Sequence, residues 1–300
     1  MAPCALCPAA GLRVQRPTPK KLILGLLLAG RGTPLSVRDA IRACALFDLT
    51  ENNVRVTLVR LSAEGLICSA ERGSYQLGPA AEGMADDIGS WREAPARLRP
   101  WEGRWLLLLG RNGKGGGNGG NGGGGRRAQR ERARAYGLTG LRELEPGLYV
   151  RPDNLAGGAQ ALRQRLRGLG LAEPGLLCSA QDLDEAREQA LHALWDRSEL
   201  DATYRRETTR LQAWMERRAT LELETAARES YLLGAEAIRR VVFDPWLPEP
   251  LVDPAARQSY FDAVLAFDAA GQQVWQQLYD RDAAMPVGGG ERLGPPLLGR

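Results

Sequence analysis

The sequence has very little histidine and lysine. Among its 300 residues the one histidine is His192, and the three lysines are Lys20, Lys21 and Lys114. A single histidine argues against a Ser-His-Asp or Cys-His catalytic arrangement and against a histidine-rich metal site. Lys and Arg together number 40 against 36 for Asp and Glu, which leaves a net charge of only +4. This weak positive balance permits binding to nucleic acid without requiring it, so the position of the charges must decide.

The sequence also lacks a hydrophobic run long enough to span a membrane. Its longest run, residues 22–29, is interrupted by Gly25 and falls far short of the about 20 residues that a span needs. Lys20 and Lys21 precede this run as in a signal peptide, but no small-x-small cleavage site follows them. We therefore expect a cytoplasmic protein that makes no membrane contact.

Metal sites and nucleotide sites find little support in the cysteines and glycines. Cys4 and Cys7 form a single C-x-x-C pair, and the sequence has no second pair that would complete a four-ligand site. The other three cysteines, Cys44, Cys68 and Cys178, lie among apolar residues and are predicted to be buried, reduced thiols. We expect no metal and no cofactor.

A glycine-rich run over residues 113–125 resembles a phosphate-binding loop in composition alone. Such a loop needs Ser or Thr after its lysine, whereas Lys114 is followed by Gly115. The run is therefore predicted to be a flexible insertion.

The N-terminal quarter has the pattern of three short helices followed by a hairpin. Residues 1–17 lack periodicity and are predicted to be a disordered leader, and apolar residues then recur at helical spacing within 22–27, 37–44 and 54–61. Ser36 and Thr50 are candidate N-caps, and Gly65 is a candidate end of the third helix. Two strand-like runs, 66–70 and 74–77, follow. This order predicts a winged helix-turn-helix domain over residues 18–92, which includes a linking helix from Pro79 to about residue 91.

The rest of the chain divides into a mixed segment and a helical segment. Residues 101–180 alternate strand and helix signals and predict a small α+β domain, with Pro95 and Pro100 marking the boundary before it. Residues 181–282 predict helices almost throughout, and Asp253 followed by Pro254 is a good start for the last one. Three prolines in 244–251 predict an extended segment that either connects two helices or closes a pocket. The tail, 283–300, is predicted to be disordered. The chain is thus a multidomain α+β protein.

The third helix, near residues 50–64, carries the candidate DNA-reading side chains. If Val54, Leu58 and Leu61 face the core, the outward face has no carboxylate before Glu64. Asparagine suits adenine, arginine suits guanine or phosphate, and small apolar groups suit thymine methyls. The predicted reading residues on and beside this face are Asn52, Asn53, Arg55, Val56, Val59 and Arg60. Arg72 at the hairpin tip, with Lys20, Lys21 and Arg38, would contact the DNA backbone.

Several motifs, in this order, resemble the PaaX-like regulators, the family typified by the repressor of phenylacetate catabolism. They are Asn53-Val54-Arg55 with Arg60-Leu61 and Glu64-Gly65-Leu66, then Trp101-Glu102-Gly103-Arg104-Trp105 and Gly147-Leu148-Tyr149-Val150-Arg151-Pro152, and finally Leu233-Gly234, Ile238-Arg239, Asp244-Pro245, Leu247-Pro248, Leu251 and Asp253. The resemblance covers about residues 20–280. The glycine-rich insertion and the proline-bearing leader depart from the family pattern.

The resemblance implies a winged helix, a ferredoxin-like middle domain and an all-helical C-terminal domain. It also implies a homodimer, without enzyme activity, that represses a catabolic operon at a double-stranded DNA operator. An aryl-CoA thioester such as phenylacetyl-CoA, or another small acidic effector, would release it. On this basis the candidate effector-binding residues are Tyr204, Trp214, Arg239, Arg240 and Trp246. Two alternatives stay open: a winged helix that binds protein, and a metal-dependent nuclease that uses Asp153 or Asp182.

Overall fold

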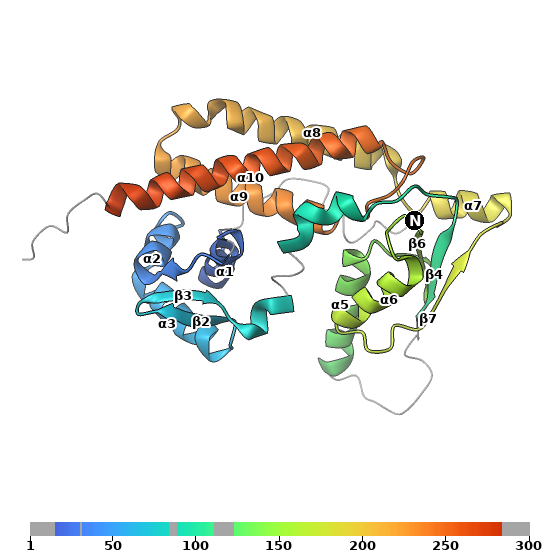
Figure 1. Cartoon of the computed structure of the whole chain (residues 1–300), viewed down its shortest axis with the longest axis horizontal. Helices are drawn as coiled ribbons and strands as arrows, with labels where there is room; N and C mark the ends of the chain where they lie inside the picture. The colour runs from blue at the N-terminus through green and yellow to red at the C-terminus, as the bar shows by residue number, and fades with distance from the viewer. Residues whose placement is uncertain (1–15, 31, 84–88, 111–122, 284–300) are drawn as a thin grey trace, which may run out of the picture.

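The chain folds as an α+β protein with two small antiparallel sheets and a set of long C-terminal helices. The computed structural model describes residues 16–30, 32–83, 89–110 and 123–283 (Figure 1). Residues 1–15 of the predicted leader, residues 284–300 of the predicted tail and most of the predicted glycine-rich insertion lie outside the described residues. We call residues 16–83 the N-terminal unit, residues 98–180 the sheet unit and residues 182–283 the helical unit. No helix in the described ranges combines the length and hydropathy that crossing a membrane requires.

The N-terminal unit has the predicted three helices and hairpin. These elements are α1 (Pro19–Ala29), α2 (Val37–Ala45), α3 (Glu51–Ala63), β2 (Ile67–Glu71) and β3 (Ser74–Leu77). Both predicted caps are confirmed, because the Ser36 hydroxyl accepts from the Asp39 N–H at 3.0 Å and the Thr50 hydroxyl accepts from the Asn53 N–H at 3.4 Å. Gly65, with φ +68°, follows the end of α3 as predicted.

A two-residue strand in this unit was not predicted. Strand β1 (Leu35–Ser36) pairs antiparallel with β3 and gives a sheet in the order β1-β3-β2. Its pairing places the hairpin against the start of α2, where the Val37 N–H donates to the Gly73 carbonyl at 2.9 Å. The hairpin tip is therefore held close to α2.

Two short 3-10 helices stand in the region predicted to link the first two domains. They are η1 (Pro79–Ala81) and η2 (Ser90–Arg97), and residues 84–88 between them are outside the described ranges. Pro95 lies inside η2, three residues before the first residue of the sheet unit. Trp91 of η2 is buried against Phe261 of the helical unit, with ring centroids 5.8 Å apart. Helix η2 is thus packed against the helical unit.

The sheet unit contains one four-stranded antiparallel sheet. Its elements are β4 (Trp105–Leu109), α5 (Gly123–Leu138), β5 (Arg142–Glu145), β6 (Leu148–Pro152), α6 (Gly158–Gly168) and β7 (Leu176–Ala180), and the strand order is β5-β6-β4-β7. Strand β4 pairs on both sides. Its alternate residues pack into two cores: Trp105 into the core shared with the helical unit, Leu106 and Leu108 into the one under α5 and α6.

The sheet corrects two predictions. Strand β5 was missed, because its sequence Arg-Glu-Leu-Glu carries three charged residues and gives no apolar run. Cys178 was expected to be buried, but it is exposed because β7 forms an edge of the sheet, and Cys68 on β2 is only half-buried. Cys44 on α2 is buried as predicted, and burial raises the pKa of its thiol to about 11.

The helical unit consists of α7 (Glu185–His192), α8 (Arg197–Arg217), η3 (Arg218–Thr220), α9 (Leu223–Val242) and α10 (Pro254–Ala283). Helix α10 packs against both α8 and α9. Its predicted start is confirmed, since Asp253 Oδ1 accepts from the N–H groups of Ala255 at 3.0 Å and Ala256 at 3.2 Å. These hydrogen bonds lower the pKa of the Asp253 carboxyl, with a further contribution from Arg205. In Figure 1 the long helices cross the top of the view, above the other two units.

An aromatic contact holds the N-terminal unit against the helical unit. Tyr231 of α9 packs edge-on against Phe47, with ring centroids 5.5 Å apart, and its hydroxyl donates to the Lys21 carbonyl of α1 at 3.1 Å. Gly25 allows this approach, because a Cβ there would lie 2.9 Å from the Tyr231 hydroxyl oxygen. Burial raises the pKa of Tyr231 to about 12, so the hydroxyl stays protonated and able to donate.

This contact predicts an energetic coupling between Phe47 and Tyr231. We expect the free energies of unfolding of Phe47→Leu, Tyr231→Leu and the double variant to show an interaction energy of about 0.5–1.5 kcal/mol, as packed aromatic pairs do. Urea unfolding of the full chain measures it. The control cycle pairs Phe47→Leu with Tyr136→Leu, which lies in the other core and should be additive. If the changes in the free energy of unfolding caused by Phe47→Leu and Tyr231→Leu were additive too, the contact would be contradicted.

Candidate nucleic-acid interface

Helix α3 presents one buried side and one exposed side, as its sequence predicts. Val54, Leu58 and Leu61 are buried, with exposures of 0%, 3% and 1%. The six predicted reading residues, Asn52, Asn53, Arg55, Val56, Val59 and Arg60, are all exposed. Val56 and Val59 stand out because large apolar side chains with exposures of 41% and 68% gain nothing from facing water.

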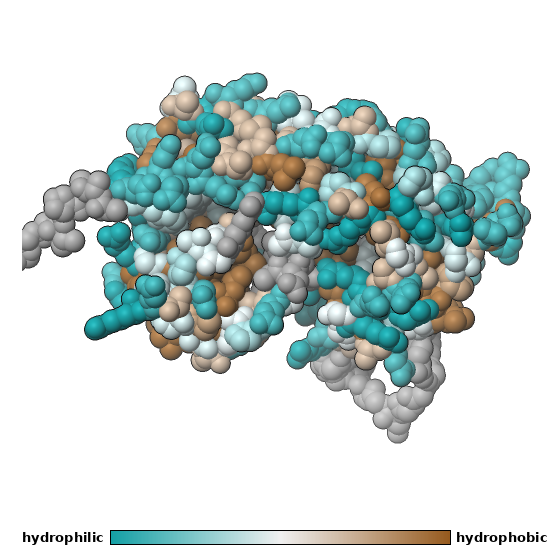
Figure 2. Space-filling view, viewed as in Figure 1, coloured by the Kyte–Doolittle hydropathy of each residue, from teal (hydrophilic) through white to brown (hydrophobic). Residues whose placement is uncertain are grey.

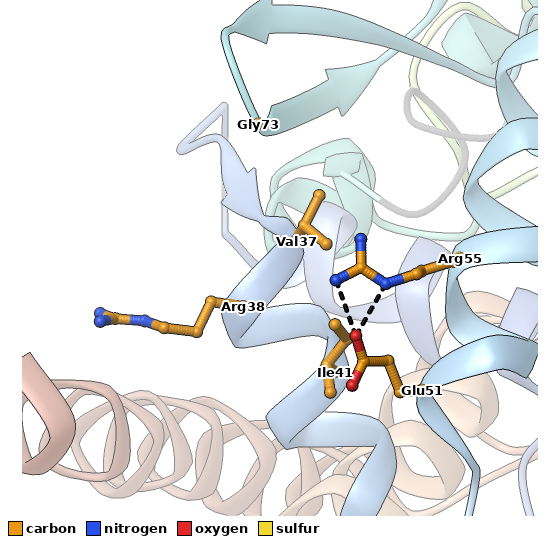
Figure 3. A pocket seen from close by; sticks show the side chains of 6 residues that line it. All are labelled: Val37, Arg38, Ile41, Glu51, Arg55 and Gly73. Carbon is orange, nitrogen blue, oxygen red and sulfur yellow. Dashed lines mark hydrogen bonds and ion pairs between the residues drawn. The ribbon is translucent and has the colours of Figure 1, made fainter. Parts of the chain in front are cut away.

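A hollow of about 540 Å³ lies beside the N-terminal half of α3. Its lining residues are Val37, Arg38, Ile41, Glu51, Arg55 and Gly73, so α2, α3 and the hairpin tip all contribute to it (Figure 3). Its floor is apolar, from Val37 and Ile41, and it carries charged side chains at the rim. The fold thus joins two predicted contact residues, Arg38 and Arg55, at one concave surface.

An ion pair in this hollow was missed by the sequence analysis. Glu51 Oε1 accepts from Arg55 Nε at 2.8 Å and lies 2.7 Å from Arg55 Nη2. Glu51 stands on the flank of α3 beside Arg55, and the sequence analysis, which considered the outward face alone, did not include it. The i, i+4 spacing of Glu51 and Arg55 was a usable signal for this pair.

The other predicted backbone contacts lie at different places. Arg72 is exposed at the hairpin tip, between β2 and β3. Lys20 Nζ lies 2.6 Å from Glu64 Oε2, at the far end of α3 from the hollow. The side chain of Lys21 is exposed, but its carbonyl faces Tyr231 of the helical unit. The predicted contact residues thus spread over the unit, and Arg38 and Arg55 share the hollow.

Two of the candidate effector residues meet at one half-buried carboxylate, that of Asp244. The Tyr204 hydroxyl donates to Asp244 Oδ2 at 2.7 Å, and the Trp246 backbone N–H donates to Asp244 Oδ1 at 2.7 Å. Burial raises the pKa of Asp244 while the hydrogen bond from Tyr204 opposes this, and burial raises the pKa of Tyr204 well above its usual value. The segment 244–251 connects α9 to α10, and the Trp246 carbonyl accepts from Asn154 Nδ2 of the sheet unit at 2.6 Å.

The remaining three candidate effector residues have separate surroundings. Trp214 is 1% exposed and packs against Phe267, with ring centroids 4.6 Å apart. Arg240 pairs with Glu236 at 3.0 Å. The Arg239 guanidinium carbon lies 5.7 Å from the centroid of the Phe243 ring. The structure therefore brings Tyr204 and Trp246 together and leaves the other three in different contacts.

Two family models match the chain, in the order of its units. A model described as PaaX-like protein matches residues 18–81, and one described as PaaX-like protein C-terminal domain matches residues 195–277. The chain belongs to the PaaX-like family. These two matches include both the N-terminal unit with its hollow and most of the helical unit of this PaaX-like chain.

A solved structure supports the fold of the PaaX-like chain. The uncharacterized protein Rv0674 from Mycobacterium tuberculosis is 21% identical, with a TM-score of 0.52 over 85% of this chain and 99% of that one. At this identity the likeness concerns the fold alone. A search of curated proteins found no match.

The acidic residues of the PaaX-like chain do not gather into a metal site within the described ranges. No group of three His, Cys, Asp or Glu side chains there could hold a metal ion. Asp153, a candidate nuclease residue, is 8% exposed, and its Oδ1 lies 2.5 Å from Arg99 Nη2. Asp182 is exposed after β7. The Cys4 and Cys7 pair lies outside the described residues.

The orientation of α3 predicts that substitutions at two neighbouring positions change the stability of the protein by very different amounts. Val59→Ala should change the free energy of unfolding by less than about 0.5 kcal/mol, because its side chain faces solvent. Leu58→Ala should lower it by about 2–5 kcal/mol, because it leaves a cavity in the core. Urea denaturation of the two variants checks this. Equal losses for both would mean that α3 is rotated from the orientation described.

Proposed function

We propose that this protein is a sequence-specific DNA-binding transcriptional repressor that reads DNA with α3. The observation that carries the proposal is the exposed face of α3, where Asn, Arg and Val side chains stand without burial. Those residue types supply what a major-groove reader needs: amide groups for adenine, guanidinium groups for guanine and apolar groups for thymine methyls. Membership of the PaaX-like family supports the same function.

We infer that the N-terminal unit is a winged helix-turn-helix domain, within boundaries of about 18–92. Helices α2 and α3 are joined by residues 46–50, and the hairpin β2–β3 follows directly. In this arrangement the second helix of the pair enters the major groove and the hairpin tip reaches the flanking backbone. Arg38 and Arg72 are then placed to contact phosphates beside the hollow, and Lys20 and Lys21 to contact them from α1.

We propose a ferredoxin-like fold for residues 101–180. The order β4-α5-β5-β6-α6-β7 has the β-α-β-β-α-β succession of that fold, and its strands form one antiparallel sheet. The helical segment, 181–282, is proposed to bind the effector and to form the homodimer. The two predicted effector residues that meet at Asp244 lie at the junction of the helical and sheet units, where a ligand could change how the units pack.

We propose a small acidic effector, an aryl-CoA thioester such as phenylacetyl-CoA, that lowers DNA affinity when it binds. Arg239 and Arg240 on α9 are the nearest cations in sequence to Asp244 and Trp246, and they suit a phosphate or carboxylate group. Binding at one site then shifts the population between two states of different DNA affinity.

The proposal predicts a loss of DNA binding when α3 loses its cations. In gel-shift titrations with a duplex enriched from a random-sequence library by the wild-type protein, Arg60→Ala and Arg55→Ala should each weaken binding by about 1–3 kcal/mol. The matched control is Arg228→Ala, an exposed arginine on α9, which should bind like wild type.

The salt dependence of the same titrations separates the proposed function from its rivals. The logarithm of the affinity should fall linearly with the logarithm of salt concentration, because phosphate contacts release counterions. Wild-type affinity for DNA in an R55A/R60A double variant would refute the role of α3. Cleavage of the duplex with a divalent metal would instead favour the nuclease alternative.

The effector proposal predicts a ligand-dependent rise in thermal stability. Phenylacetyl-CoA at about 100 times its dissociation constant should add about 2.7 kcal/mol to the free energy of unfolding, with coenzyme A and free phenylacetate as comparison ligands. Differential scanning fluorimetry measures the shift in Tm. No shift with any aryl-CoA thioester would remove this class of effector and leave the DNA-binding proposal untouched.

A further inference from the structure

The ion pair between Glu51 and Arg55 leaves half of each side chain free. One carboxylate oxygen, Oε1, contacts both Nε and Nη2 of Arg55, and the third guanidinium nitrogen points away from Glu51 (Figure 3). Among the described residues, no partner is found for Glu51 Oε2 or for Arg55 Nη1. The pair therefore offers two donor nitrogens, Nη1 and Nη2, beside one acceptor oxygen, Oε2.

The ion pair between Glu51 and Arg55 contributes little to the stability of the protein. The side chains of Glu51 and Arg55 are 57% and 59% exposed, and exposed pairs at this spacing on a helix contribute only a few tenths of a kcal/mol. Both side chains instead lie at the rim of the hollow, in the N-terminal half of α3. That half of a recognition helix is the part that contacts base edges.

The free groups of the pair match one base pair. In the major groove, guanine presents two acceptors, O6 and N7, and its partner cytosine presents a donor, the N4 amino group. A pair of donors from Arg55 followed by an acceptor from Glu51 has the complementary pattern. An adenine–thymine pair presents a donor where the guanidinium needs an acceptor, so it would leave a buried donor unpaired.

Glu51 also changes how Arg55 interacts with DNA that lacks the recognised base pair. A lone exposed arginine binds any phosphate, and this is the source of binding without sequence preference. The pair of an arginine and a carboxylate has no net charge with which to attract a phosphate, and the orientation of the arginine is already restricted before DNA arrives. Glu51 therefore lowers the affinity for wrong sequences while it aligns Arg55 for the right one.

We propose that Glu51 is a specificity-determining residue of the DNA surface, which reads a guanine–cytosine pair jointly with Arg55 and suppresses phosphate binding by Arg55. This rests on the proposed function of α3. Its effect differs from that of the cations around it, because removal of Glu51 strengthens binding to unrelated DNA.

The test compares Glu51→Ala with Glu64→Ala, which removes the carboxylate of an exposed ion pair at the other end of α3. Each full-length variant is used for selection from a random-sequence library and for titration of the selected duplex and a scrambled one. We expect the wild type to require guanine–cytosine at one position, and E51A to lose about tenfold of that preference. E51A should bind the scrambled duplex more tightly, whereas E64A should keep the base preference.

A modified base tests the partner of Arg55. Replacing the guanine at that position by 7-deazaguanine removes the N7 acceptor, and it should weaken binding of the wild type about tenfold but leave the R55A variant unaffected. Far-UV circular dichroism of E51A and R55A checks that both remain folded, as exposed side chains allow.

The outcomes separate this inference from the function it rests on. A wild-type protein that binds selected and scrambled duplexes equally would overturn the proposed function, and with it the role of Glu51. A selective wild-type protein whose E51A variant keeps every base preference would overturn the role of Glu51 alone. An unchanged affinity of E51A for the scrambled duplex would overturn the suppression of phosphate binding.

Discussion

Phe261 on α10 is the point at which three distant parts of the chain pack together. Its ring lies edge-on to Trp91 of η2 and to Trp246 of the segment 244–251, with ring centroids 5.8 Å away in each case. The Trp246 carbonyl in turn accepts from Asn154, so the same contact also reaches the sheet unit. Close-packed interiors transmit small displacements, so a ligand that moves Trp246 would also act on η2. In Figure 2 the surface over α8 and α10 is mixed, with hydrophilic residues standing beside apolar ones.

The N-terminal unit reaches the helical unit through a second set of aromatic contacts. Tyr231 lies between Phe47 and Trp275, and its hydroxyl is bound to the first turn of α1. Apolar side chains of the N-terminal unit and the helical unit consequently form one continuous core. The orientation of α3 relative to the long helices is thus set by packed rings and not by a flexible connection. Packed contacts of this kind are what a regulator needs, because a change in one unit must alter the position of another unit.

Local sequence patterns predicted the helices and strands that bury one face. They failed for elements whose structure depends on pairing with another strand, and for the charged strand β5. The caps at Ser36 and Thr50 and the two faces of α3 follow from residue type and from the helical period, so both were predictable. Strand β1 is only two residues long and exists because β3 lies beside it. The exposure of Cys178 depends on β7 being an edge, which a single strand's sequence does not reveal.

The sequence by itself determined that α3 has an outward face of Asn, Arg and Val, because a period of 3.6 residues places Val54, Leu58 and Leu61 on the opposite side. The motifs also determined the family. Only the tertiary structure decided that Arg38, Arg55 and Gly73, from α2, α3 and the hairpin, border one hollow. It alone decided that Tyr204 and Trp246 share the Asp244 carboxylate. The physical reason is range: helix periodicity acts within a few residues, whereas these contacts join side chains that only the packing of separate elements brings together.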